Sequence, residues 1–479
     1  MSGKFLLIGL DGTEGSLLRR WMAEGRLPAL ASLVDRAQWS RIHGPRSVGP
    51  ASVWPSLMTG TQPRVHQFFS EFTWDPATMR TSRAGWKHFE PFWLEIGRRG
   101  RGTTVLDVPF SPGRTIGDNV EVTDWGAHDW LGGSTVVEPA HLKTAVRGCG
   151  IHPYLATAVD AGGPDDKHGL ERVRARSIEG TRMRGELALR LLEEGKDDFF
   201  FVVFSELHRA GHYLWHTVDS THEAHRAHDG LLRIAIETDR QIGRLIEAFP
   251  SDATVVVFST KGMRNALGIP TLLDPLFVEL GLAADPEIRS SSWRDRAGSL
   301  FSSVKRHLPR PIKTLYHRSV PRSISFRLAQ PPMRTVFDWS RTRAFPLVAD
   351  QHGSIRINLR GRERDGTVGR EEYEPLLGEL SEILMSLRSA DGLRLVREVY
   401  QPAPDGVDHR LPDLVVEWHD EAGRAPLHLE DPPIESQPIG TKFTGQHTEE
   451  GFVIHREGSI PLVVPPVLDL VELHDAITA

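Results

Sequence analysis

Residues 198–216 read DFFFVVFSELHRAGHYLWH, an apolar run followed by three histidines spaced four residues apart. The apolar run predicts a buried β-strand, and the histidines follow its carboxyl end, where open α/β sheets bind ligands. If the segment after the strand is helical, His208, His212 and His216 share one face, and two neighbours can bind one divalent ion. The alternative is an ordinary histidine-rich surface helix in a chain with 22 histidines.

Similar strand-like runs recur along the chain, and amphipathic segments separate many of them. The amphipathic segments predict helices over 14–25, 180–195 and 231–249, and a short final helix after Pro466. Strands that alternate with helices indicate an α/β fold with a mostly parallel central sheet and helices on both faces. The other predicted strands are 4–10, 103–108, 254–259, 354–359, 394–400 and 413–418.

The composition is that of a soluble globular protein, with 39% hydrophobic and 25% charged residues among 479. A net charge of −6 argues against nucleic acid as a partner. The single cysteine, Cys149, excludes an intramolecular disulfide and a cysteine-rich zinc site. The amino-terminal apolar run is short and ends in Asp11, so we expect a first strand, no membrane partner and a cytoplasmic protein.

The segment 284–345 differs from the rest because basic residues are frequent and strand–helix alternation lapses. Between Arg289 and Arg343 the acidic residues are only Asp295 and Asp338. We interpret this segment as a basic insertion or cap, and 1–283 with 346–479 as the core. The insertion is either a solvated face or a cap that attracts an anionic substrate or partner. A nucleic-acid role would require salt-dependent binding, which nothing else in the sequence indicates.

Six segments match the motifs of a known protein family in the same order along the chain. They span nearly the whole chain outside the basic insertion. Together they resemble the alkaline phosphatase superfamily, specifically its nucleotide pyrophosphatase/phosphodiesterase-like branch. The resemblance implies an alkaline-phosphatase-like fold and a site that normally holds two metals. The segments are LLIGLDG (6–12), SVWPSLMTGTQPRVH (52–66), FSELHRAGHYLWH (204–216), IETDRQIGRLIEAF (236–249) with TVVVFSTKGM (254–263), GSIRINLRGRERDGTV (353–368) and TGQHTEEGFVI (444–454).

The resemblance implies that one family metal is bound by an Asp, a His four residues later and a late His. Here those positions hold His208, His212 and His447. Three neutral imidazoles with an open fourth position suit zinc, and iron or another transition metal is the alternative. His216 lies beyond the ligand spacing, and we expect it not to bind. The opposite interpretation is that His208 marks a lost ligand.

The second family metal is expected to be absent. Asp11 remains, but the family's Asp-His pair reads Thr260-Lys261, and an ammonium repels a cation. Lys261 is expected in the place of the metal, either paired with Asp11 or facing a substrate anion.

The family's nucleophile position falls on Pro50, which has no side-chain nucleophile. Ser47 and Ser52 lie close, and the sequence leaves open whether either replaces it. A hydroxyl also requires activation, and Ser52 is better suited to begin the following helix. The covalent route is therefore expected to be lost.

These features predict a single-metal enzyme that acts on a small anionic or polar substrate by hydrolysis, group transfer, elimination or oxidation. The alternative is a catalytically inactive binding or scaffold protein. The sequence does not indicate the oligomeric state. The candidate site residues are Asp11, Lys261 and Glu206 for catalysis, Ser52, Trp54 and Thr260 for substrate binding, and His208, His212 and His447 for the metal.

Overall fold

The computed structural model describes most of the chain. The described residues are 3–35, 37–44, 48–86, 88–126, 135–156, 159–194, 197–266, 272–284, 337–348, 352–389, 392–403, 409–419, 428–430, 433–435 and 442–479.

The chain forms two compact units. The first comprises Met1–His66, Gly85–Ala266 and Gly440–Ala479, and the second comprises Gln67–Ala84 and Leu267–Ile439. Most of the basic insertion expected at 284–345 lies outside the described residues, so that assignment stays a prediction. None of the described helices is long and apolar enough to cross a membrane.

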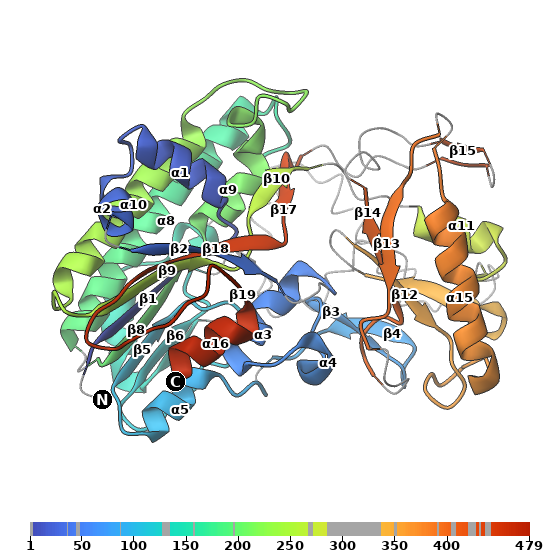
Figure 1. The fold of residues 1–479 in the computed structure, drawn as a ribbon, viewed down its shortest axis with the longest axis horizontal. Helices are drawn as coiled ribbons and strands as arrows, with labels where there is room; N and C mark the ends of the chain where they lie inside the picture. Colours follow the sequence, from blue (N-terminus) through green and yellow to red (C-terminus); the bar gives the residue numbers. More distant parts are fainter. Residues whose placement is uncertain are drawn as a thin grey trace. The chain divides into compact units, whose positions relative to one another are not determined.

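A nine-stranded sheet, counted over the described residues, forms the centre of the first unit (Figure 1). Neighbouring strands β5, β8, β1 and β9 run parallel, whereas β18 is antiparallel to both β9 and β2. This confirms the predicted α/β fold with a mostly parallel sheet. In spatial order the strands are β19 (Val467–Asp469), β2 (Gln38–His43), β18 (Glu450–Arg456), β9 (Thr254–Ser259), β1 (Phe5–Leu10), β8 (Phe199–Phe204), β5 (Thr103–Leu106), β6 (Val120–Thr123) and β7 (Val136–Glu138).

Helices cover both faces of this sheet, which explains why its central strands are continuous apolar runs (Figure 1). On one face, Leu6 and Ile8 pack in a core with Leu187 and Ile234, and each such side chain contributes roughly 1.5–3 kcal/mol by burial. On the opposite face, Phe201 packs against α5. The first face carries α1 (Gly15–Ala23), α2 (Pro28–Val34), α8 (Lys167–Glu194), α9 (Glu206–Leu214) and α10 (Gly230–Ala248), and the second α3 (Val53–Thr59), α5 (Phe92–Arg98) and α16 (Leu470–Thr478).

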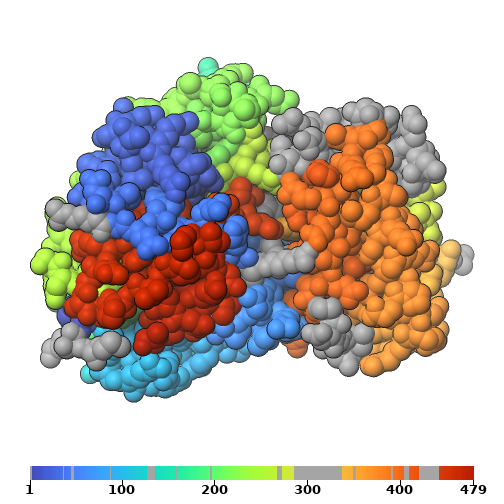
Figure 2. All heavy atoms as spheres, in the orientation of Figure 1, coloured from blue at the N-terminus to red at the C-terminus, as the bar shows by residue number. Residues whose placement is uncertain are grey.

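The first and last segments of the chain meet in this unit, because β2 pairs with both β18 and β19. Figure 2 shows them side by side on one face. The shorter elements of the unit are η1 (Pro50–Ser52), α4 (Pro63–His66), η2 (Ala140–Leu142), α6 (Lys143–Gly148), α7 (Pro153–Ala156), η3 (Trp215–Thr217), β10 (Met263–Asn265) and β17 (Gly445–His447).

The second unit has its own four-stranded antiparallel sheet, counted over the described residues, in the order β11-β12-β14-β13. Three of these strands were predicted from sequence at 354–359, 394–400 and 413–418, but they lie outside the central sheet. The elements are β3 (Phe72–Asp75), β4 (Arg80–Arg83), α11 (Leu273–Glu279), η5 (Trp339–Arg341), β11 (Ala344–Leu347), β12 (Gly353–Ile357), α15 (Arg370–Ser386), β13 (Val396–Tyr400), β14 (Leu414–Trp418), β15 (His428–Glu430) and β16 (Pro433–Glu435).

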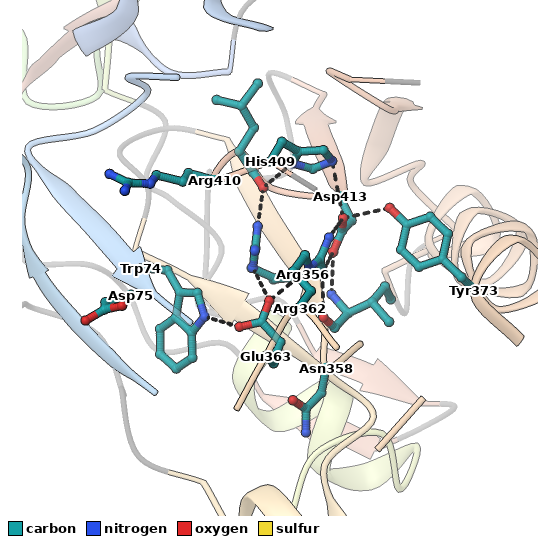
Figure 3. Close-up of polar contacts among 12 residues, drawn as sticks. Trp74, Asp75, Arg356, Asn358, Arg362, Glu363, Tyr373, His409, Arg410 and Asp413 are labelled. Atoms are coloured by element: carbon teal, nitrogen blue, oxygen red, sulfur yellow. Dashed lines mark hydrogen bonds and ion pairs between the residues drawn. The ribbon is translucent and has the colours of Figure 1, made fainter. Parts of the chain in front are cut away.

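A buried charge network joins the segments of the second unit (Figure 3). Arg356 Nε lies 2.7 Å from Glu363 Oε1, and Arg362 Nη2 lies 2.7 Å from Asp413 Oδ2. Trp74 Nε1, on the β3–β4 hairpin, donates to Glu363 Oε2 at 2.7 Å. Two guanidinium groups thus balance two carboxylates, and the network ties residues 67–84 to 267–439.

We predict that this network makes the second unit sensitive to acid. Burial raises the pKa of Asp413, but hydrogen bonds and charge from Arg362 outweigh burial and lower it. The resulting stability is present above the unfolded aspartate pKa of about 3.9 and is lost as pH falls from there through the folded pKa. Urea unfolding of Asp413→Asn at pH 7 should show a loss of about 3–5 kcal/mol.

The matched control is Asp365→Asn, since Asp365 pairs with Arg364 at the surface of the same unit. It should leave stability nearly unchanged. An Asp413→Asn protein as stable as the control at pH 7 would show that the network is not needed for the fold.

Candidate metal centre

The candidate site lies at the carboxyl edge of the central sheet. Leu10 of β1 pairs with Phe204 of β8, and Gly9 pairs with Phe258 of β9. Because the three strands are parallel and in register, the residues that follow them emerge side by side. Asp11, the start of α9 and the Thr260-Lys261 pair therefore meet at one edge.

Three histidines converge at this edge. His208 and His212 lie one turn apart on α9, which begins at Glu206 directly after β8. His447 comes from β17, which pairs with β10 so that His447 lies opposite Met263. His208 Nε2 lies 3.1 Å from His212 Nε2 and 3.0 Å from His447 Nε2. The ligand atoms of the three rings all lie within 4.8 Å of one another, as a shared metal ion requires.

The outer nitrogens of two rings contact oxygen acceptors. His208 Nδ1 lies 2.5 Å from Asp11 Oδ2, and His212 Nδ1 lies 2.9 Å from the Gly445 carbonyl oxygen. An imidazole whose Nδ1–H points at an oxygen keeps the Nε2 lone pair for a metal. The residues present therefore fit one transition metal such as zinc. His208 and His447 are buried and His212 is half-buried, so His212 is the most exposed of the three.

Asp11 is fully buried and its two oxygens have different partners. One contacts His208 and the other accepts a hydrogen bond of 3.0 Å from Trp54 Nε1. Through these contacts Asp11 can orient the His208 ring, and Trp54 can hold Asp11 in place. The predicted catalytic role of Asp11 and the predicted substrate-binding role of Trp54 stay predictions.

The other half of the family site does not fit a second metal. Lys261 is 6% exposed, and its ammonium lies 3.5 Å from the Pro50 carbonyl oxygen. Thr260 is fully buried. An ammonium and a hydroxyl at these positions supply no charged ligand, and the ammonium repels a cation.

The Ser52 hydroxyl, close to Pro50, is bonded within its own turn. Ser52 is fully buried, and its Oγ donates to the Gly49 carbonyl oxygen at 2.7 Å. Ser52 ends a 3₁₀ turn directly before α3, as the sequence predicted, but its side chain does not cap that helix. Ser47 lies outside the described residues. The expected substrate-binding role of Ser52 has no support in these contacts.

Glu206 belongs to a buried ion network. Its Oε1 lies 2.9 Å from Arg184 Nη2 and 2.9 Å from His152 Nε2, and Arg184 also contacts Asp107. Burial raises the pKa of Glu206, but the charge of Arg184 and the hydrogen bond from His152 outweigh it and lower the pKa to about 2. A carboxylate held in this way anchors the start of α9. These contacts give Glu206 a structural role, and its predicted catalytic role stays a prediction.

Sequence reasoning missed several residues that hold the site together. Arg184 lies among the buried positions of α8. A charged residue within the apolar stripe of that helix was the sequence signal that could have identified it. Gly445 acts through its carbonyl oxygen and leaves no side-chain signal. His216 is not part of the three-histidine cluster, and its Nδ1 lies 3.2 Å from Thr444 Oγ1.

Structural comparison supports the fold. The chain resembles phosphonoacetate hydrolase from Sinorhizobium meliloti 1021 in complex with phosphonoformate, with a TM-score of 0.55, 14% identity and coverage of 100% of this chain and 96% of that chain. It also resembles a mutant of alkaline phosphatase PafA, with a TM-score of 0.53, 9% identity and coverage of 99% and 94%. Murine ectonucleotide pyrophosphatase/phosphodiesterase 5 in complex with AMP matches with a TM-score of 0.44, 10% identity and coverage of 99% and 94%.

Sequence comparison identifies the family. No curated protein matches the chain. The family model for type I phosphodiesterase / nucleotide pyrophosphatase matches residues 5–423, which include the first strand, the histidine helix and the Thr260-Lys261 pair. The chain therefore belongs to the type I phosphodiesterase / nucleotide pyrophosphatase family.

Proposed function

We propose that this protein is a metal-dependent enzyme with one metal, held by His208, His212 and His447, that acts on a small anionic substrate. The observation that carries the proposal is the convergence of three Nε2 atoms, two of them on rings whose Nδ1 contacts an oxygen acceptor. A random loss of the family's aspartate would seldom leave a ligand-grade side chain that points at the two remaining histidines.

The donor set favours zinc, because three imidazoles with an open fourth position are a common catalytic zinc site. Iron or another transition metal suits the same donors. Such an ion supplies Lewis acidity at neutral pH, and a redox-active metal would add oxidation. The chain's own residues hold the rings in place through Asp11 and the Gly445 carbonyl.

The reaction we favour is hydrolysis or transfer of an oxyanion group without a covalent enzyme intermediate. Pro50 removes the family nucleophile, and the Ser52 hydroxyl is bonded to Gly49. Elimination and oxidation are compatible with the same donor set. The missing nucleophile at Pro50 and the bonded Ser52 hydroxyl also support a second candidate, an inactive binding protein. A measurement of metal content distinguishes the two candidates.

Elemental analysis of the purified protein after zinc-replete expression tests this proposal. We expect one metal per chain, and its loss in His208→Ala and His447→Ala because each removes one of three ligands. His216→Ala is the matched control, since His216 lies on the next turn outside the cluster, and it should retain the metal. Two metals per chain would contradict the rebuilt site, and none would support the inactive binding protein.

Replacement of Asp11 should weaken metal binding without removing a ligand. Asp11→Asn eliminates the carboxylate charge beside His208 Nδ1, and loss of such a partner lowers affinity by roughly 10–100-fold. Competition with a chromophoric chelator measures the change. Trp54→Phe, which removes one hydrogen bond to Asp11, should cause a smaller loss. Equal affinity in Asp11→Asn and the unaltered protein would refute the orienting role.

Gly12 should be needed for the position of His208. Its φ of +58° disfavours other residues, and a Cβ there would lie 2.9 Å from His208 Cγ. Gly12→Ala should therefore lower metal affinity. Gly25→Ala is the control, because Gly25 has a φ of +69° but a Cβ at that residue would have no neighbouring atom within 4 Å. Both variants should lose roughly 1–2 kcal/mol of stability, and only Gly12→Ala should lose affinity.

A further inference from the structure

The Lys261 ammonium is a buried cation with little compensation. Lys261 is 6% exposed, and among the described residues its ammonium has one hydrogen-bond partner, the Pro50 carbonyl oxygen at 3.5 Å. An ammonium has three donor hydrogens, and a buried charge costs several kcal/mol unless an opposite charge is present. Within the described chain no carboxylate lies within 4.0 Å of it. The position thus lacks the anion that would stabilise it.

The neighbouring Thr260 hydroxyl is also uncompensated. Thr260 is fully buried, and its Oγ1 has no hydrogen-bond partner among the described residues. A buried hydroxyl without a partner costs about 1–3 kcal/mol. An anion within reach of both side chains would offer acceptors to the Lys261 ammonium and the Thr260 hydroxyl.

The backbone of this pair is fixed. Ser259 Oγ accepts from the Thr13 amide at 3.2 Å and donates to the Lys261 carbonyl oxygen at 2.7 Å. These two bonds fasten the turn after β9 to the loop after β1, which carries Asp11. The side chains of Thr260 and Lys261 are therefore presented from a preorganised turn, which lowers the cost of binding.

We propose that Lys261 and Thr260 form an oxyanion subsite that binds one phosphoryl, sulfuryl or carboxylate group of the substrate. The inference rests on the proposed function for its place beside the metal, at the same edge of the sheet. Lys261 would supply the charge and Thr260 a hydrogen bond to a second oxygen. The Lys261 ammonium would thus bind the substrate anion at the position where the family pattern has metal ligands.

Isothermal titration calorimetry with inorganic phosphate, sulfate and acetate tests the subsite on the full-length, zinc-loaded protein. Lys261→Met keeps the length of the side chain and removes the charge, so at least one of these anions should bind roughly tenfold or more weakly. Thr260→Val should weaken the same anion by a smaller factor. Comparison of the three anions separates a tetrahedral oxyanion from a carboxylate.

The control is Lys143→Met, which removes an exposed ammonium from α6 of the same unit and should leave binding unchanged. The metal content of each sample distinguishes the anion-subsite proposal from the proposal of a three-histidine metal site. One bound zinc with equal anion affinity in Lys261→Met and the unaltered protein would overturn the subsite alone. Absence of zinc with Lys261-dependent anion binding would overturn the metal proposal and retain the subsite.

Discussion

The contact between the Asp11 carboxylate and the His208 ring is the interaction on which the site depends. It joins the end of β1 to α9, and it determines which nitrogen of His208 faces the other two histidines. The parallel register of β1 and β8 brings the two residues together, and Trp54 holds the second carboxylate oxygen. A carboxylate that contacts the outer nitrogen of an imidazole fixes the orientation of the ring and makes it a better metal ligand.

The departures from the family pattern are consistent with one another. In that pattern Asp11 binds the second metal, and an aspartate occupies the position of His208. Lys261 disfavours a second metal, and we propose that Asp11 instead orients a histidine at position 208 that binds the one metal. On this proposal, the residues at 208, 260 and 261 together replace a two-metal site with one metal ion and one ammonium.

The sequence predicted the individual helices and strands better than it predicted which sheet each strand joins. Continuous apolar runs such as 199–204 are strands in any arrangement, because burial on both faces leaves a strong compositional signal. The strands near 355 and 415 were also predicted from the sequence, yet they form a second sheet. Their partners are set by contacts distant in sequence, among them the ion network around Glu363 and Asp413.

From spacing and family resemblance, the sequence predicted that His208, His212 and His447 form one group, and the three rings do lie together. Their role as metal ligands stays a proposal, and the supporting contacts were not predicted. The roles of Asp11, Trp54 and Glu206 depend on which atom each side chain contacts across the fold, and residue type alone does not encode that. The supporting role of Arg184 was not predicted because Arg184 is distant in sequence from the histidines. The role of Gly445 was not predicted because Gly445 acts through its backbone carbonyl.

X-ray absorption spectroscopy of the zinc-loaded protein tests whether three histidines hold one metal ion. We expect one zinc coordinated by three imidazole nitrogens at about 2.0–2.1 Å, with the multiple-scattering pattern of histidine. We also expect Asp11→Asn to retain this three-imidazole signature, since Asp11 contacts a ligand and not the metal. A spectrum dominated by carboxylate oxygens, or one with a second metal about 3.5–4 Å away, would contradict this single-metal site.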